Sequence, residues 1–202
     1  MPLACNSSIL SAKSTDPGQI RRRAASLVEV RAMQSSLKLP KDVLADPRHD
    51  AVVKLLTTHA GLLWEGGRAS VATLPLTSAL SGALRGALTA RQACQGMELI
   101  TEKLANEQKG LDVVRAKAPE SPQNARVSRV LFVANDGSTR FYRDCESLLG
   151  KYSQRLMVCR IEVGGDEMGK AVLGTSKLVR SVLVFDKAFA AQALLSLVPQ
   201  VG

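Results

Sequence analysis

The chain has 202 residues, of which 46% are hydrophobic and 3% aromatic, with a formal net charge of +9 and a pI near 9.7. This length suffices for one domain with extensions or for two small domains, and the apolar share predicts that most of the chain folds. The scarcity of aromatic side chains excludes a broad stacking platform for single-stranded bases. No apolar run approaches the roughly 20 residues that a membrane span requires. The basic balance favours a polyanionic partner over a soluble protein with a merely solvated basic surface.

The first 23 residues are predicted to form a basic tail. Residues 1–20 are poor in acids and lack hydrophobic periodicity, and the basic triplet Arg21, Arg22 and Arg23 follows them. A mitochondrial presequence and an ordinary disordered basic tail fit this composition equally well. Bound to a particle, such a tail would find RNA a natural partner.

Residues 24–75 are predicted to be a helical extension. Apolar spacing indicates an amphipathic helix over 24–37, which Leu39-Pro40 ends, and a second helix whose apolar stripe runs from Ala51 to Leu63. Residues 68–74 have the composition of a short strand. Neither histidine of this region has a Cys, Asp or Glu partner at ligand spacing, so we expect packing or solvent exposure for both.

Residues 76–198 are predicted to be the main domain. Helical patterns cover 77–90 and 97–104, and a short link at 91–96 joins them. The chain then becomes polar, and residues 106–126 are predicted to be a loop insertion.

Three strand–helix units follow this insertion. The predicted strands are 130–134, 156–163 and 179–185, and the helices after the second and third are 166–173 and 187–198. Strands that alternate with helices of about ten residues imply crossover connections and a sheet covered by helices on both faces. The expected fold class is therefore α/β.

Two glycine-containing corners open predicted helices. The run Asn135-Asp136-Gly137-Ser138 suits a tight turn with a capping side chain, and its free N–H groups together with Arg140 also suit a phosphate oxygen. Gly164 and Gly165 precede a helix that bears Lys170, which a nucleic acid can contact. Neither corner is a P-loop or a dinucleotide-binding fingerprint.

Catalytic and metal-binding patterns are absent from the sequence. The cysteines Cys5, Cys94, Cys145 and Cys159 are scattered, with no C-x-x-C pair, and no histidine neighbours a nucleophile. A small enzyme on a flavodoxin-like sheet would therefore lack an acid, base or nucleophile pair. We expect no metal, no cofactor and no small-molecule substrate.

The order of these motifs resembles the kink-turn-binding ribosomal protein superfamily, the L-seven-Ae and L-thirty-e group, and especially its YlxQ-like branch. The resemblance covers about 76–198: Gln95-Gly96-Met97-Glu98 opens a helix, a strand ends in Asn-Asp-Gly-Ser, Asp166-Glu167-Met168-Gly169-Lys170 follows the next strand, and Phe185-Asp186-Lys187 precedes the last helix. It implies a three-layer α/β/α sandwich with a small mixed sheet and no catalytic activity.

The resemblance also implies which residues contact RNA. The family grips RNA at positions that correspond here to Gln95, Gly96, Glu98, Asn135, Asp136, Ser138, Gly164, Gly165 and Lys170. Helix N-termini and short polar side chains suit the recognition of RNA loops and bulges. The kink-turn readers carry Gly-x-Asn-Glu followed by Lys, whereas Gly96 is followed here by Met97 and Glu98. We therefore expect added contacts from the neighbouring residues Arg91, Gln92, Lys103, Arg140 and Lys177 and from the N-terminal Arg21, Arg22 and Arg23.

The expected function is that of a structural RNA-binding protein of a ribosome or of a ribosome assembly intermediate. The expected partners are rRNA or another structured RNA and neighbouring ribosomal or assembly proteins, without a membrane. The acid-poor tail favours a mitochondrial setting, with the cytoplasm or nucleolus as the alternative. The rival function is a non-catalytic protein-interaction module of the same fold.

Overall fold

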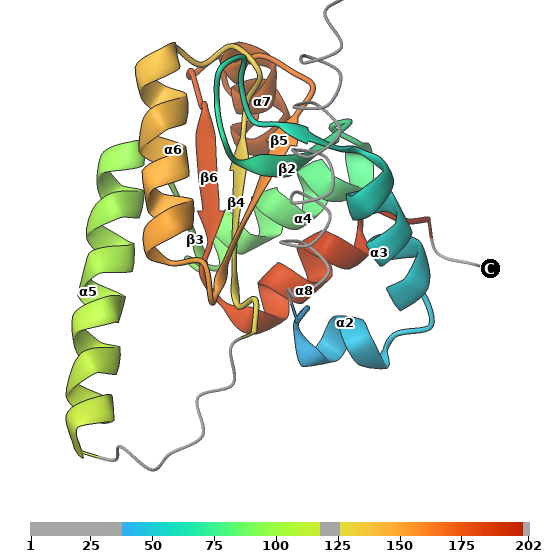
Figure 1. Ribbon diagram of the computed structural model, residues 1–202. Helices are drawn as coiled ribbons and strands as arrows, with labels where there is room; N and C mark the ends of the chain where they lie inside the picture. The colour runs from blue at the N-terminus through green and yellow to red at the C-terminus, as the bar shows by residue number, and fades with distance from the viewer. Residues whose placement is uncertain (1–37, 118–125, 200–202) are drawn as a thin grey trace, which may run out of the picture. The chain divides into compact units, whose positions relative to one another are not determined.

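The structure, a computed structural model, describes residues 38–117 and 126–199 (Figure 1). The helices in chain order are α2 (Lys41–Ala45), α3 (His49–Thr58), α4 (Ser78–Thr89), α5 (Met97–Lys117), α6 (Thr139–Lys151), α7 (Gly165–Leu173) and α8 (Lys187–Leu195). The strands are β1 (Ala60–Leu62), β2 (Ser70–Leu74), β3 (Ala93–Gln95), β4 (Arg129–Val133), β5 (Leu156–Ile161) and β6 (Ser181–Val184). The predicted basic tail, with its three arginines, and the predicted helix over 24–37 lie outside the described residues.

The strands form one mixed sheet of six strands in the order β1-β2-β5-β4-β6-β3. Strands β2, β5 and β4 run parallel, while β1, β6 and β3 each pair antiparallel with their neighbours. The register pairs Val133 of β4 with Arg160 on one side and with Ser181 on the other. Strand β4 therefore lies in the interior of the sheet. The carboxyl ends of β5, β4 and β3 lie at the same end of the sheet as the start of β6.

Helices cover both faces of the sheet (Figure 1). One buried cluster joins the sheet to α4, α7 and α8 and to the short helices α2 and α3, and a second joins the opposite face to α5 and α6. Along β4, Val130 and Phe132 belong to the first cluster, while Leu131 and Val133 belong to the second. This alternation is what a strand buried on both faces requires. The predicted three-layer α/β/α sandwich with a mixed sheet is confirmed.

Side-chain caps fix where several helices begin. The Thr77 hydroxyl accepts the Leu80 N–H at 3.1 Å, and the Ser138 hydroxyl accepts the Phe141 N–H at 3.3 Å. The Asp186 carboxylate accepts the N–H groups of Ala188 and Phe189 at 2.8 and 3.1 Å. These caps satisfy donors that have no acceptor within the helix, so the local sequence determines the start of each helix.

The structure corrects the predicted extension over 24–75. Residues 60–74 are not outside the main domain, because β2 pairs with β5 and β1 pairs with β2. The second predicted helix ends at Thr58, so Leu62 lies in β1 and Leu63 follows it. Residues 41–45 form a short helix that the sequence analysis had not predicted. The sheet recruits residues 60–74 because their apolar side chains contribute to both buried clusters, Ala72 and Leu74 to the first and Leu63 and Val71 to the second.

The loop insertion predicted over 106–126 is wrong for residues 106–117, which continue α5. The prediction rested on polarity, but Glu, Gln, Lys, Arg, Leu and Ala all favour helix, and they make up seven of the twelve residues from 106 to 117. The polar composition reflects exposure, since the buried residues of α5 are confined to Ile100 and Leu104. The predicted link at 91–96 likewise contains the short strand β3.

Candidate nucleic-acid interface

The two ends of the sheet differ in what they bring together. We call the end at which β4 and β5 finish the loop end, and the end at which they begin the base end. Strand β3 also finishes at the loop end, because the Gly96 N–H donates to the Ser181 carbonyl at 3.2 Å beside the start of β6. Ligands of α/β sheets usually bind beyond the carboxyl ends of the strands, so a binding site is expected at the loop end.

The corner between β4 and α6 is held by hydrogen bonds that the sequence did not reveal. The Tyr142 hydroxyl donates to the Ala134 carbonyl at 2.9 Å and accepts the Gly137 N–H at 3.1 Å. A side chain at Gly137 would collide with the ring of Phe141. The Ser138 cap then starts α6. The corner therefore forms the tight turn and the helix cap that its sequence predicts, and the Tyr142 hydroxyl supplies the two hydrogen bonds that hold the turn.

The corner between β5 and α7 lies directly beside the first corner. The Asn135 N–H donates to the Val163 carbonyl at 3.0 Å, and a Cβ at Gly164 would lie 3.6 Å from Oδ2 of Asp136. Asp136 in turn pairs with Arg180, whose Nε lies 3.4 Å from Oδ1. Both partners are more than a third exposed, so this ion pair orients the loops and adds little stability.

Helix α7 packs closely against residues 177–180. The Val179 N–H donates to the Gly165 carbonyl at 2.9 Å. A Cβ on Gly169 would strike the Lys177 carbonyl, and a Cβ on Gly165 would lie 2.8 Å from the side chains of Leu178 and Arg180. The glycines of this helix are therefore needed for backbone approach, and they place Lys177 beside the corners.

The start of α5 completes the loop end. Gly96 has φ +88°, a left-handed conformation that favours glycine, and its carbonyl accepts the Ile100 N–H at 3.1 Å. Glu98 is exposed in the first turn of the helix. The structure therefore brings together ten of the predicted residues: Gln95, Gly96, Glu98, Asn135, Asp136, Ser138, Arg140, Gly164, Gly165 and Lys177.

Three helices begin at this end of the sheet, namely α5, α6 and α7 (Figure 1). The first N–H groups of a helix have no intrahelical acceptor and carry a partial positive charge. The N-cap residue of α7, Gly164, supplies no side-chain hydrogen bond. Converging helix N-termini flanked by short polar side chains can accept phosphate oxygens and base edges.

The formal charge of the loop end is close to zero. Its basic side chains are Arg140, Lys170, Lys177 and Arg180, and its acidic ones are Glu98, Asp136, Glu162, Asp166 and Glu167. The acids lie in the first turns or in the preceding loops, where the helix dipole favours them. The net positive charge of the chain is therefore located elsewhere.

Several predicted contact residues lie away from the loop end. Arg91 and Gln92 are at the base end, where the Phe185 N–H donates to the Gln92 carbonyl at 3.0 Å and Arg91 closes α4 with φ +57°. The Lys103 ammonium lies 4.2 Å from the ring centre of Phe185, which places it near that same end. Lys170, on the second turn of α7, is exposed at the margin of the loop end and is counted in its charge. Of the predicted contacts Arg91, Lys103 and Arg140, the first two therefore lie near the base end and only Arg140 lies at the loop end.

Sequence analysis missed three residues of the loop end. Arg180 and Tyr142 act through contacts with Asp136 and Ala134, 44 and 8 residues away in the chain. Leu178 is 46% exposed beside Lys177, although its neighbour Val179 is buried. Neighbouring side chains of an extended segment point to opposite sides, so a buried Val179 could have indicated that Leu178 points outward. No local pattern indicates the contacts that Arg180 and Tyr142 make.

Of the described cysteines, Cys145 and Cys159 are buried and Cys94 is partly buried. Burial raises the pKa of Cys145 to about 12, with Asp144 adding to the effect, and burial raises the pKa of Cys159 to about 12. Burial likewise raises the pKa of Cys94, and Glu107 adds to this while Lys103 opposes it. A raised pKa favours the protonated, unreactive thiol in all three cysteines.

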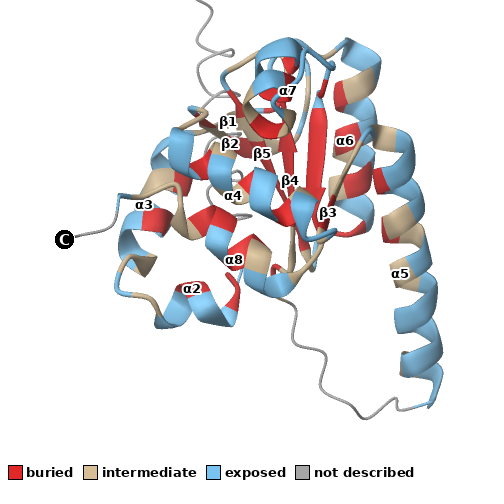
Figure 2. Cartoon of the chain, turned by 180° about the vertical axis from the view of Figure 1, so that it is seen from behind, coloured by how far each residue is buried: buried red, intermediate tan, exposed pale blue. Residues whose placement is uncertain are grey.

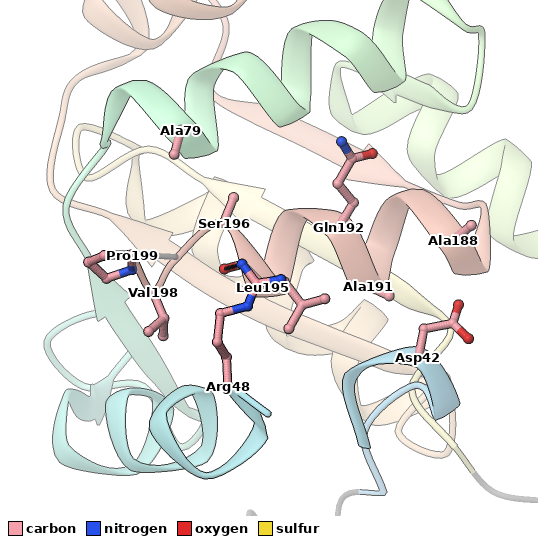
Figure 3. Close-up of a pocket in the computed structure, with 10 residues that line it drawn as sticks. All are labelled: Asp42, Arg48, Ala79, Ala188, Ala191, Gln192, Leu195, Ser196, Val198 and Pro199. Atoms are coloured by element: carbon pink, nitrogen blue, oxygen red, sulfur yellow. Dashed lines mark hydrogen bonds between the residues drawn. The ribbon is translucent and has the colours of Figure 1, made fainter. Parts of the chain in front are cut away.

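A separate cavity of about 510 Å³ lies between α2, α4 and α8 (Figure 3). Two of its lining residues, Asp42 and Arg48, are charged. The Arg48 guanidinium is held by Asp46 at 2.8 Å and donates to the Leu195 carbonyl at 3.4 Å. Its hydrogen bonds lower the pKa of Asp46 to about 2. Because Arg48 is already paired, this cavity does not present an acid–base pair.

Within residues 38–117 and 126–199, no group of three or more His, Cys, Asp and Glu side chains is arranged to hold a metal ion. In the same ranges, no helix has the length and apolar character needed to cross a membrane.

Comparison with known proteins leaves the function open. No protein-family model and no curated protein matches the sequence. Among solved structures, the chain is similar to one described as the structure of a protein with unknown function from Bacillus halodurans C, with 17% identity over 60% of this chain and 98% of that chain. The TM-score of this pair is 0.41, so the similarity carries no argument about function.

Proposed function

We propose that this chain is a non-catalytic, structural RNA-binding protein of a ribosome or of a ribosome assembly intermediate, with a mitochondrial particle as its setting. The loop end is the proposed contact surface. The observation that carries the proposal is the convergence of three helix N-termini and two glycine corners at one end of the sheet. Such a surface offers backbone donors and short polar side chains to an irregular RNA segment.

The near-neutral charge of the loop end shapes the proposed recognition. A surface with four basic and five acidic side chains gains little from counterion release, so shape and hydrogen bonds must supply its selectivity. Asp136 and Arg180 hold the corners in place and leave Asn135, Ser138 and Lys177 exposed. We therefore expect the loop end to prefer bulged or looped RNA over a regular duplex.

The proposal is tested by ultraviolet crosslinking of the tagged protein in its own cells, with sequencing of the attached RNA. We expect reads concentrated on one rRNA segment, and the compartment of that rRNA identifies the particle. The double variant Arg140→Glu/Lys177→Glu should lose most of these reads. The variant Lys41→Glu/Lys54→Glu makes the same charge change on α2 and α3, away from the loop end, and should keep them.

A specific observation favours a second candidate function, a protein-interaction module of the same fold. The loop end bears five acidic side chains, and Leu178 and Leu99 are 46% and 56% exposed on either side of it. Apolar residues surrounded by mixed charges are typical of protein contacts. Background levels of RNA in the crosslinking experiment, together with one protein partner lost from the loop-end variant, would favour this candidate over the first.

A further inference from the structure

The positive charge of the described residues is concentrated at the base end, on the side of the sheet covered by α5 and α6. Residues 38–117 and 126–199 contain twenty-two Lys and Arg and fifteen Asp and Glu, a formal +7. We define the base-end basic surface by six residues: Lys109, Arg115, Lys117, Arg129, Lys151 and Arg155. Glu107 and Asp112 are the acids among them, so this small region carries +4 of the +7.

Two arginines at the root of this surface are fixed by a shared carboxylate. The Nε of Arg129 lies 2.8 Å from Oε2 of Glu107, and Nη1 of Arg155 lies 3.4 Å from the same oxygen. Arg155 also donates to the Leu104 carbonyl and to the Gln108 side chain, both at 3.3 Å. The side chains of both arginines are less than a fifth exposed, so their positions are set before any partner arrives.

The network extends from these arginines onto α5 and α6. On α5, Gln108 donates to Asp112 at 2.8 Å, and Arg115 lies 3.4 Å from the same Asp112 oxygen. On α6, Lys151 lies 5.4 Å from the ring centre of Tyr152, and the guanidinium of Arg155 lies 5.4 Å from the same ring. These contacts connect Arg115, Arg129, Arg155 and Lys151 into one network, and Lys109 and Lys117 add exposed charge on the same part of α5.

Two carboxylates, Glu107 and Asp112, cannot neutralise the six cations of this surface. Burial lowers the pKa of Arg155, Glu107 opposes that effect, and the nearby charges of Arg129 and Arg115 lower the pKa further. Burial is the largest cause of this shift, and the excess of positive charge follows instead from the count of six cations against Glu107 and Asp112. An additional anion at this surface would therefore gain energy.

Helix α5 carries the surface beyond the sheet (Figures 1 and 2). Its 21 residues span about 31 Å, whereas the five residues of β4 span about 17 Å. One side of α5 is buried against the sheet at Ile100 and Leu104. Further along the helix the same side carries the polar residues Gln108, Asp112 and Arg115, so it is charged where α5 extends past the sheet. Lys109 and Lys117 are exposed on this projecting part.

The exposed apolar residues of α5 do not form a docking stripe for a partner helix. Leu111, Val113 and Val114 are 38%, 54% and 60% exposed. At about 100° per residue, Val113 points roughly 200° away from Leu111, so the three do not share one face. The cations are the common feature of this end, which favours an anionic polymer over an apolar partner.

We propose that the base-end basic surface binds the phosphate backbone of a regular RNA duplex, so that the chain contacts RNA at both ends of its sheet. This inference rests on the proposed function, since it takes the polyanion to be RNA. Arg115 and the exposed lysines contact phosphates, while Arg129 and Arg155 supply positive charge at fixed positions. Guanidinium and ammonium groups contact phosphates without regard to sequence, so this end supplies affinity and the loop end supplies selectivity.

The test uses the full-length protein and two RNA probes, a blunt 20-bp duplex and the same duplex with a three-nucleotide bulge. Lys109→Glu/Lys151→Glu changes the base end, Arg140→Glu/Lys177→Glu changes the loop end, and Lys41→Glu/Lys54→Glu is the control with equal charge change. We expect the base-end variant to lose about tenfold or more in affinity for both probes. Its plot of log affinity against log salt concentration should be shallower than that of the control by roughly 1.5 to 2. Circular dichroism and a thermal melt check that each variant is folded.

The outcomes separate this inference from the proposed function. A base-end variant that binds the plain duplex as tightly as the control variant would overturn the inference, and so would loss of an acidic protein partner with unchanged RNA binding. Loss of duplex binding in the base-end variant, with no effect of the loop-end variant on the bulged probe, would support the inference and reject the loop end as an RNA site. Absence of binding to both probes at 50 mM salt would overturn both proposals.

Discussion

The two ends of the sheet are built from different physical interactions, although the same strands connect them. At the loop end, glycines allow backbone segments to approach and helix N-termini to converge, and the charges nearly cancel. At the base end, arginines gather around one carboxylate, and a helix projects past the sheet with its lysines exposed. Most of the predicted contact residues lie at one end, and +4 of the +7 charge of the described residues lies at the other. A basic pI is therefore poor evidence for any single site, because the location of the charge decides what it can attract.

The largest expected effect tests the close packing of the loop end. Gly169→Ala introduces a Cβ into the Lys177 carbonyl, and since backbone atoms on both sides must move, we expect a loss of about 3 kcal/mol in the free energy of unfolding. Urea denaturation measures it. The matched control is Gly86→Ala, where α4 is exposed and nothing lies within 4 Å of the new Cβ. This change should stabilise the protein by about 0.5 to 1 kcal/mol. Equal effects of the two changes would contradict the packing described.

The next effect tests the electrostatic construction of the base end. Glu107→Gln keeps the side-chain shape but leaves Arg129 and Arg155 without their shared anion, so we expect a loss of about 2 kcal/mol at low salt. Because salt screens repulsion between the two guanidinium groups, the loss should shrink in 1 M NaCl. Glu102→Gln, at an exposed position of the same helix, is the control and should change stability little. A salt-independent loss would show that hydrogen-bond geometry, rather than charge, is what Glu107 supplies.

The smallest effect separates two buried tyrosines. Tyr142→Phe removes the hydroxyl that bridges Ala134 and Gly137, leaving a buried carbonyl and an N–H group unpaired, so we expect a loss of about 1.5 kcal/mol. Tyr152→Phe is the matched change at the base end. Its buried hydroxyl has no hydrogen-bond partner within the described parts of the chain, so its removal should be neutral or slightly stabilising. Thermal denaturation of both variants provides the measurement, and an equal loss in both would refute the special role of Tyr142.

The fold could be predicted from the sequence wherever its signals are local. Strands β4, β5 and β6 are short apolar runs that end in turn residues, and each was predicted to within a few residues. Strand β3 was not, because three residues between two helices give no period to detect. The C-terminal half of α5 was not predicted, because an exposed helix and a loop can have the same polar composition.

The candidate site was predictable in part for the same reason. Corner residues such as Asn135, Ser138 and Gly164 occupy strand ends, and parallel pairing of those strands is enough to bring them together. The distant Asp136–Arg180 pair depends on the position of β6 next to β4, which no local pattern specifies. The base-end basic surface also depends on the long-range approach of α5 to the start of β5.

The position of β2 also determines how the chain can be divided. Strand β5, Leu-Met-Val-Cys-Arg-Ile, is almost entirely buried because β2 occupies one of its edges and β4 the other. A fragment that begins at residue 76 would lose β1 and β2 and leave this apolar strand with unpaired backbone groups open to any other chain. Exposed apolar edges of this kind promote aggregation. The outer edges of the intact sheet are instead the three-residue strands β1 and β3, which are too short to recruit another sheet efficiently. We therefore expect residues 60–74 to limit aggregation through β5 as well as completing the core.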